Sequence, residues 1–331
     1  MSMQPAIPQA RQGLRLTSRL GAAFATFALL AVVPPLLQAV GEPFYISIVS
    51  RMMIYAIAAL SLDLILGYGA LVSFGHAAFM GIGAYVVIIL TSMGVGDLAV
   101  HLVAALAAAG LFALVTGAIS LRTQGIYFLM ITLAFGQMAY FFFVSLSAFG
   151  GDDGMALATR STLFGTGLIA SDTGLFYAIL IVLMAVFGIL WRITRSRFGR
   201  VLIGTRESAL RMEAVGFRVF PYQLAAYVIS ACICAVSGVL IANQTMYVSP
   251  AVMSWAKSGE LIIMVVLGGV GNLTGAMVGA LLTIGLEEGI ARFTQHWKIV
   301  FGFLLLMVVL FSPGGLTALA ARLTGSRGDR Q

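Results

Sequence analysis

Charged residues are scarce in this chain of 331 residues. Asp, Glu, Lys and Arg together make up 9% of it, whereas apolar residues make up 60%. Soluble domains carry about a quarter charged residues, so this composition excludes an ordinary soluble domain and predicts an all-α, polytopic membrane protein. The net charge of +7 is then a signal of topology. Basic and aromatic residues are not interleaved, so no nucleic-acid partner is expected.

Lysine is nearly absent, which excludes nucleotide hydrolysis by this chain. The two lysines, Lys257 and Lys298, stand in Ser-Trp-Ala-Lys-Ser and His-Trp-Lys-Ile. Neither follows the glycine pattern of a phosphate-binding loop. If ATP drives this protein, another chain must bind it, and no cofactor is expected here.

Cysteine and histidine are also too few and too scattered for a metal centre. The two cysteines lie two residues apart in an apolar run, which favours small buried residues over a disulfide or a metal site. No Ser/His/Asp set is convincing either, which argues against an enzyme. The residues concerned are Cys232, Cys234, His76, His101 and His296.

Long apolar segments fill most of the remaining chain. A membrane span needs about 20 mostly apolar residues. We expect about ten spans: 20–41, 46–66, 70–92, 98–120, 124–148, 173–191, 221–242, 258–270, 275–291 and 297–313. The eighth and ninth are short, and together they are also compatible with one broken helix plus a re-entrant piece.

The distribution of Lys and Arg predicts the orientation. With both termini in the cytoplasm, 14 of the 19 basic residues lie inside and five lie outside, as the positive-inside rule requires. The expected organisation is a cytoplasmic tail at 1–19, a transmembrane permease domain at 20–316 and a second cytoplasmic tail at 317–331. Within the permease domain, residues 192–218 form a cytoplasmic loop.

This central loop holds seven basic residues against two glutamates. Thr205 is suited to cap a short helix, Glu207 and Arg211 to pair at i,i+4, and Gly216 to end it. A helix too short and too charged to cross the bilayer predicts a cytoplasmic docking element. A solvated loop, or one that binds anionic membrane lipid, is the alternative.

Glycines interrupt two of the expected spans. Leu66-Gly67-Tyr68-Gly69 and Leu267-Gly268-Gly269 each lead into a glycine-rich segment, which suggests a weak parallel repeat whose two turns face the cytoplasm. Tight helix packing is the ordinary explanation, and unwound segments that line a path are the alternative.

Few polar residues fall inside the expected spans. The stretch Ser73-Phe74-Gly75-His76-Ala77-Ala78-Phe79 places a hydroxyl, an imidazole and two aromatic rings on a glycine-broken span. We predict a translocation path along Ser73, Phe74, His76 and Phe79, together with Gln137. The alternative is that His76 hydrogen-bonds a carbonyl of a neighbouring helix. Acidic residues lie near span ends, which disfavours a proton-driven pump.

Four stretches of the sequence resemble a known family, the permease subunits of branched-chain amino acid ABC importers of the LivM type. They are LDLILGYGALVSFGHAAFMGIGAY (62–85), the loop GGDDG (150–154), SRFGRVLIGTRESALRMEAVGF (196–217), and SPAVMSWAKSGELIIMVVLGGVGNLTGAMVGALL (249–282) continued by LEEGIARFTQHWKIVFGFLLLMVVLFSPGGL (286–316). The third and fourth are quite specific. Together the four cover most of the chain after residue 50.

The resemblance implies a subunit of a heteromeric importer in the bacterial inner membrane. It implies three kinds of partner: a second permease, two cytoplasmic ATPase subunits and a periplasmic substrate-binding protein. The second permease would be homologous, or else identical. The family's coupling helix maps onto Arg206–Gly216, so the ATPase-coupling residues would be Arg206, Glu207, Arg211, Glu213 and Gly216. Glu213-Ala214-x-Gly216 echoes a docking signature, although Arg211-Met212 replaces the small residues often found there.

The expected substrates are branched-chain or related small amino acids. Urea, short amides and small organic acids stay open as alternatives. A stand-alone secondary transporter is a further alternative, and sparse ionisable residues inside the spans argue against it.

Overall fold

The computed structural model describes residues 9–40, 44–163 and 167–293, together with residues 296, 299, 302 and 303. Within these residues the chain is largely helical, as predicted. Eleven α-helices are found: α1 (Gln9–Val40), α2 (Phe44–Leu66), α3 (His76–Ser92), α4 (Leu98–Ser120), α5 (Ile126–Val144), α6 (Asp172–Arg195), α7 (Arg197–Glu207), α8 (Ala209–Ala214), α9 (Val219–Thr245), α10 (Trp255–Gly268) and α11 (Leu273–Ala291). Short strands β1 (Met155–Ala156) and β2 (Tyr247–Val248) pair antiparallel.

Six of the described helices are long and apolar enough to cross a membrane: α2, α4, α5, α6, α9 and α11. Shorter apolar stretches are Ala23–Gln38 within α1 and the whole of α3. This arrangement is that of a multi-pass membrane protein. The expected tenth span, 297–313, lies almost entirely outside the described residues, as does the tail at 317–331, and α1 begins within the expected tail at 1–19.

The eighth expected span is not a full crossing. Helix α10 has 14 residues, so it is about 21 Å long, less than a hydrocarbon core of roughly 30 Å. It follows the 3₁₀ turn Pro250–Met253 and meets α11 through a short turn at Gly269–Asn272. Helices α10 and α11 pack on each other and on α2, so they form a hairpin that lies against the bundle.

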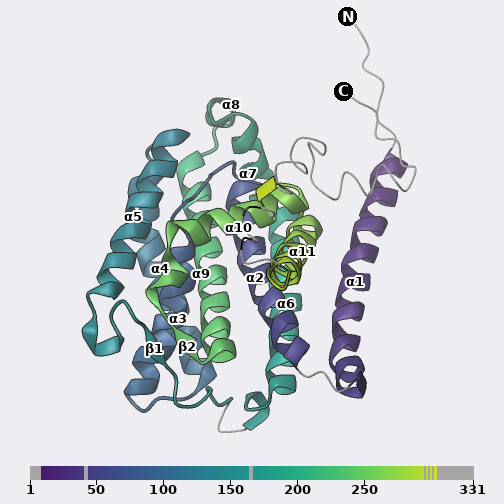
Figure 1. Ribbon diagram of the computed structural model, residues 1–331. Helices are drawn as coiled ribbons and strands as arrows, with labels where there is room; N and C mark the ends of the chain where they lie inside the picture. Colours follow the sequence, from purple (N-terminus) through teal and green to yellow (C-terminus); the bar gives the residue numbers. More distant parts are fainter. Residues whose placement is uncertain are drawn as a thin grey trace, which may run out of the picture.

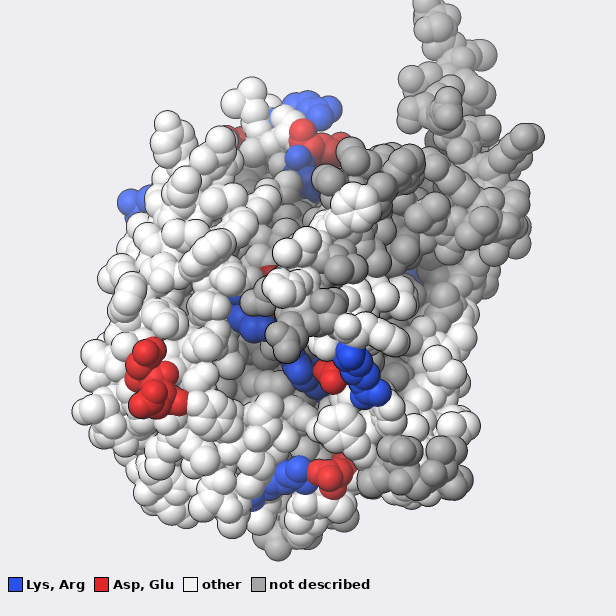
Figure 2. Space-filling view, in the orientation of Figure 1, with Lys and Arg blue, Asp and Glu red and all other residues white. Residues whose placement is uncertain are grey.

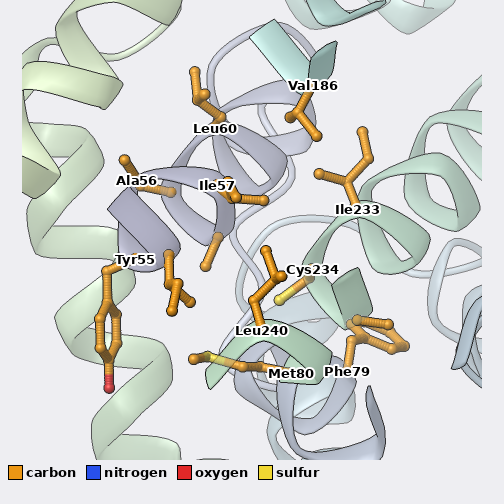
Figure 3. Close-up of a cluster of buried hydrophobic side chains, with 14 of the residues drawn as sticks. Tyr55, Ala56, Ile57, Leu60, Phe79, Met80, Val186, Ile233, Cys234 and Leu240 are labelled. Carbon is orange, nitrogen blue, oxygen red and sulfur yellow. The ribbon is translucent and has the colours of Figure 1, made fainter. Parts of the chain in front are cut away.

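Helices α2 and α9 form the centre of the bundle. Helix α9 packs on α2, α3 and α4, and α2 also contacts α6, α10 and α11. Figure 3 shows buried side chains of α2, α3, α6 and α9 that meet in this centre, with Tyr55 at its edge. Helices α4 and α5 lie on the outside (Figure 1), where their apolar side chains are largely exposed.

Glycines allow the backbones of α3 and α9 to approach closely. A Cβ atom on Gly83 would collide with the Ala235 carbonyl oxygen, and one on Gly238 would collide with the Met80 carbonyl oxygen. Small residues that face each other in this way are typical of helix pairs in membranes, where van der Waals packing is a main source of association energy.

Candidate functional site

The central loop folds as two helices. Helix α7 begins after Ser196, whose hydroxyl accepts from the Gly199 N–H, and α8 begins after Ser208, whose hydroxyl accepts from the Arg211 N–H. Ser208 has φ −166° and ψ 107°, so its extended backbone separates the two helices. Figure 1 shows α8 at one end of the molecule, which we call the α8 end.

Two details predicted for this loop are wrong. Thr205 does not cap a helix, because it lies inside α7 and its hydroxyl donates to the Leu202 carbonyl. Glu207 and Arg211 are not an i,i+4 pair on one helix, because the break at Ser208 puts Glu207 at the end of α7 and Arg211 on α8. The expected ending of the second helix at Gly216 is confirmed, since this glycine has φ +96°.

Helix α8 and the residues after it expose apolar side chains. Leu210 is 80% exposed and Val215 is 73% exposed. Arg211 and Glu213 are exposed beside them. An exposed surface that mixes apolar and charged side chains in this way is typical of a contact surface for another protein.

Arg206 differs from the other expected coupling residues because it binds the bundle. Its Nη1 donates a hydrogen bond of 2.5 Å to the Gly67 carbonyl, just beyond the end of α2. Thus α7 is joined to the end of a central helix by Arg206. All five residues, Arg206, Glu207, Arg211, Glu213 and Gly216, are exposed.

Beside Arg206, the turn after α2 meets the turn between α10 and α11. The buried Asp63 carboxylate accepts from the Gly271 N–H at 2.8 Å through Oδ1. A Cβ atom on Gly67 would collide with Asp63 Oδ1 and the Gly271 nitrogen. Gly271 has φ +77°, a conformation that glycine adopts without strain. We call these contacts of Asp63, Gly67, Arg206 and Gly271 the turn junction.

The turn junction brings together the two glycine turns of the weak repeat in the sequence. The two glycine turns lie at the same end of the molecule, as predicted, and they touch each other. The roles of Asp63 and Gly271 were missed. The Leu-Gly-x-Gly and Leu-Gly-Gly patterns signalled the turns, but nothing local in sequence pairs residues 208 positions apart.

The stretch from Ser73 to Phe79 lies inside the bundle. Ser73, His76 and Phe79 are buried. His76 Nε2 is 2.9 Å from Ser61 Oγ on α2, and the ring of His76 packs edge-on against Phe79 at 5.6 Å between centroids. The alternative expected for His76, a hydrogen bond to a neighbouring helix, is present, but its partner is the Ser61 hydroxyl and not a backbone carbonyl.

Phe74 and Gln137 are more accessible than these three residues. Both are partly buried, and the Phe74 N–H donates to Thr132 Oγ1 on α5. The predicted path therefore follows a packed seam in which α3 contacts α9, α4 and α5. Its use by substrate stays a prediction.

The hollows among the described residues include two of similar size. One, of about 450 Å³, is an almost wholly apolar groove of α4 and α5 lined by residues such as Phe112, Met138 and Phe142. The other, of about 510 Å³, lies in the loops before α6 and is lined by Arg160, Ser161 and neighbours. No group of three or more His, Cys, Asp or Glu that could hold a metal occurs in the described part of the chain.

Comparisons with known proteins agree with this architecture. Residues 44–310 match the model of a family described as branched-chain amino acid transport system / permease component. The chain is 29% identical over 317 residues to the high-affinity branched-chain amino acid transport system permease protein LivM of Escherichia coli K12, covering 87% of this chain and 74% of that protein.

Two further relatives have the same kind of description. The Pseudomonas aeruginosa permease protein BraD is 26% identical over 286 residues, which are 79% of this chain and 91% of BraD. The Escherichia coli K12 permease protein LivH is 28% identical over 140 residues, which are 41% of this chain and 45% of LivH. None of the solved structures compared with the chain matches it.

Proposed function

The chain belongs to the family of branched-chain amino acid transport system permease components, and from this membership we propose that it is the transmembrane permease subunit of an ATP-binding cassette importer. It moves branched-chain or related small amino acids across the bacterial inner membrane. Separate subunits bind and hydrolyse ATP, and a periplasmic protein delivers the substrate. The similarity to LivH over part of the chain supports a second permease of the same family as partner.

The exposed α8 surface is the observation that carries the coupling assignment. We assign Leu210, Arg211, Glu213 and Val215 to the contact with a cytoplasmic ATPase subunit, since the apolar pair supplies buried area and the charged pair supplies orientation. This assignment places the α8 end in the cytoplasm. The seven basic residues between Arg192 and Arg218 support it, because basic residues near the ends of spans favour the cytoplasmic side.

The turn junction gives movement at α8 a route into the bundle. Helix α7 is bound through Arg206 to the end of α2, and Asp63 of α2 is bound to the turn between α10 and α11. A displacement of α7 by the ATPase would therefore act on a central helix and on a short hairpin at once. Rigid helices joined by specific contacts transmit a displacement of this kind.

A double substitution on α8 tests the docking assignment. Leu210→Asp with Val215→Asp places two charges where the proposal requires apolar contact, so we expect the permease to lose co-purification with its ATPase subunit. Arg122→Ala, on the exposed turn between α4 and α5 at the end of α4, is the control because it removes a basic residue outside α7 and α8. Full retention of the ATPase by the double variant would contradict the assignment.

Two other functions predict different results. A stand-alone secondary transporter would take up substrate in vesicles that contain this chain alone, driven by an ion gradient. A permease for urea, short amides or small organic acids would keep the α8 coupling but have a binding protein of different specificity. Titration of the partner binding protein with a panel of these compounds separates the substrate classes.

A further inference from the structure

A group of charged side chains lies on the face formed by α2, α10 and α11, away from α8. Lys257 Nζ is 2.6 Å from Glu260 Oε2, and Arg51 Nη2 is 3.7 Å from Glu287 Oε1. The Tyr55 ring lies between the two pairs, since its centroid is 5.8 Å from Lys257 Nζ and 5.9 Å from Arg51 Cζ. We call Arg51, Lys257, Glu260 and Glu287 the charged belt.

The charged belt lies away from the turn junction, partway along the bundle. Helix α10 ends at the turn junction, and Lys257 is eleven residues from that end, about 16 Å along the helix, which compares with a membrane core of roughly 30 Å. Glu287 is fourteen residues along α11 from the same junction, about 21 Å away. Figure 2 agrees, because blue and red side chains gather halfway down this face.

The charged belt is not enclosed by the described part of the chain. Side-chain exposures are 34% for Arg51, 27% for Lys257, 31% for Glu260 and 18% for Glu287. Lipid tails cannot solvate such groups, so ionisable residues at this depth face a water-filled cavity or another protein. Among the described residues in Figure 2, most of the surface outside a few groups of blue and red side chains is uncharged.

Both pairs are matched in charge to an amino acid. The belt holds two cations and two carboxylates, and a zwitterionic amino acid carries one ammonium and one carboxylate. The substrate can insert into either pair, where its carboxylate binds the cation and its ammonium binds the carboxylate, so no charge is left unpaired. This lowers the cost of bringing a zwitterion into the membrane. Beyond the belt, Arg292 bonds the Tyr45 hydroxyl at 2.8 Å, so polar groups continue to the outer end of α11.

We propose that the charged belt lines the water-filled passage of the assembled transporter and transiently binds the ammonium and carboxylate groups of zwitterionic substrates. This inference rests on the proposed importer function. It places the passage on the α2–α10–α11 face, whereas the path predicted from sequence follows the packed seam beside α3.

Thiol accessibility tests the passage without changing the belt. Trp255→Cys lies in the first turn of α10, two residues before Lys257, at a position that is 56% exposed. It is made in a background with Cys232→Ala and Cys234→Ala. In proteoliposomes that contain the complete transporter, we expect a charged, membrane-impermeant thiosulfonate to react with Cys at 255 and added leucine to slow the reaction. Ile181→Cys on α6, 62% exposed on an apolar surface, is the control expected not to react.

A neutral pair tests substrate binding. Lys257→Met with Glu260→Gln removes both charges and leaves none unpaired. We expect leucine transport to fall about tenfold or more, because the substrate loses a charge-assisted contact. ATP hydrolysis stimulated by the loaded binding protein should be retained. Arg160→Gln with Asp172→Asn is the matched control, because this 2.5 Å pair joins the loop before α6 to its first turn, at the outer end of that helix.

The outcomes separate this inference from the importer function. If Cys at 255 reacts only with a lipid-soluble maleimide, or if the neutral pair transports leucine at the native rate, the charged belt does not line the passage. If the complex hydrolyses no ATP in response to the loaded binding protein even with the native permease, the importer function itself is overturned. If the neutral pair does not assemble, the labelling of Trp255→Cys decides the question.

Discussion

Replacing Arg206 tests whether the turn junction transmits movement. Arg206→Ala removes the 2.5 Å hydrogen bond to the Gly67 carbonyl and leaves the exposed α8 surface unchanged. A hydrogen bond from a charged donor contributes about 1.5–3 kcal/mol, equivalent to roughly a 12- to 160-fold change in an equilibrium. Because much of the Arg206 side chain is exposed, we expect the lower end of this range, about tenfold.

The measurement is the number of leucine molecules transported per ATP hydrolysed by the reconstituted complex. We expect Arg206→Ala to lower this ratio about tenfold while the ATPase subunits stay bound and active. Arg206→Lys should give an intermediate ratio, since it keeps one charged donor on a shorter side chain. Arg200→Ala is the control, because Arg200 is exposed on the same helix.

The Arg206 prediction has two refuting results. One is a native ratio of transport to hydrolysis in Arg206→Ala, which would mean that the hydrogen bond to Gly67 carries no coupling. The other is an equal loss in Arg200→Ala, which would mean that positive charge on α7 matters and the turn junction does not.

Three further predictions concern stability. The first two are measured by thermal unfolding of the purified chain in detergent, and the third by binding of the ATPase subunit. Gly67→Ala should destabilise the fold by about 1–3 kcal/mol, because the added Cβ atom collides with the turn junction. Gly289→Ala is the control and should not destabilise the fold, because Gly289 faces open space on α11. Equal melting temperatures of the two variants would contradict this prediction. Gly238→Ala should separate α3 from α9 at a similar cost, and native stability would refute the packing argument. Ser208→Ala should destabilise α8 by about 1 kcal/mol, seen as weaker ATPase binding, and unchanged binding would mean that the cap is dispensable.

Composition and local patterns were sufficient for the class of protein and for several details. Scarce charge and long apolar runs predict a multi-pass helical membrane protein, and this is confirmed. Gly216 was recognised as a helix end because its conformation depends only on its neighbours. The family could be named because the resemblance of the stretches at 196–217 and 249–316 is quite specific, and residues 44–310 match the family's model.

Packing decided what local patterns could not. The sequence does not show which charges pair, and the structure places Arg51 and Lys257 within helices, where each pairs with a glutamate. Arg51 meets Glu287, and Asp63 meets Gly271, across more than two hundred residues. Hydropathy and periodicity report each segment's own preference for lipid or water. Which charges share a membrane face, and which turns touch, depends on how α2, α10 and α11 pack, and that is set only when the whole bundle forms.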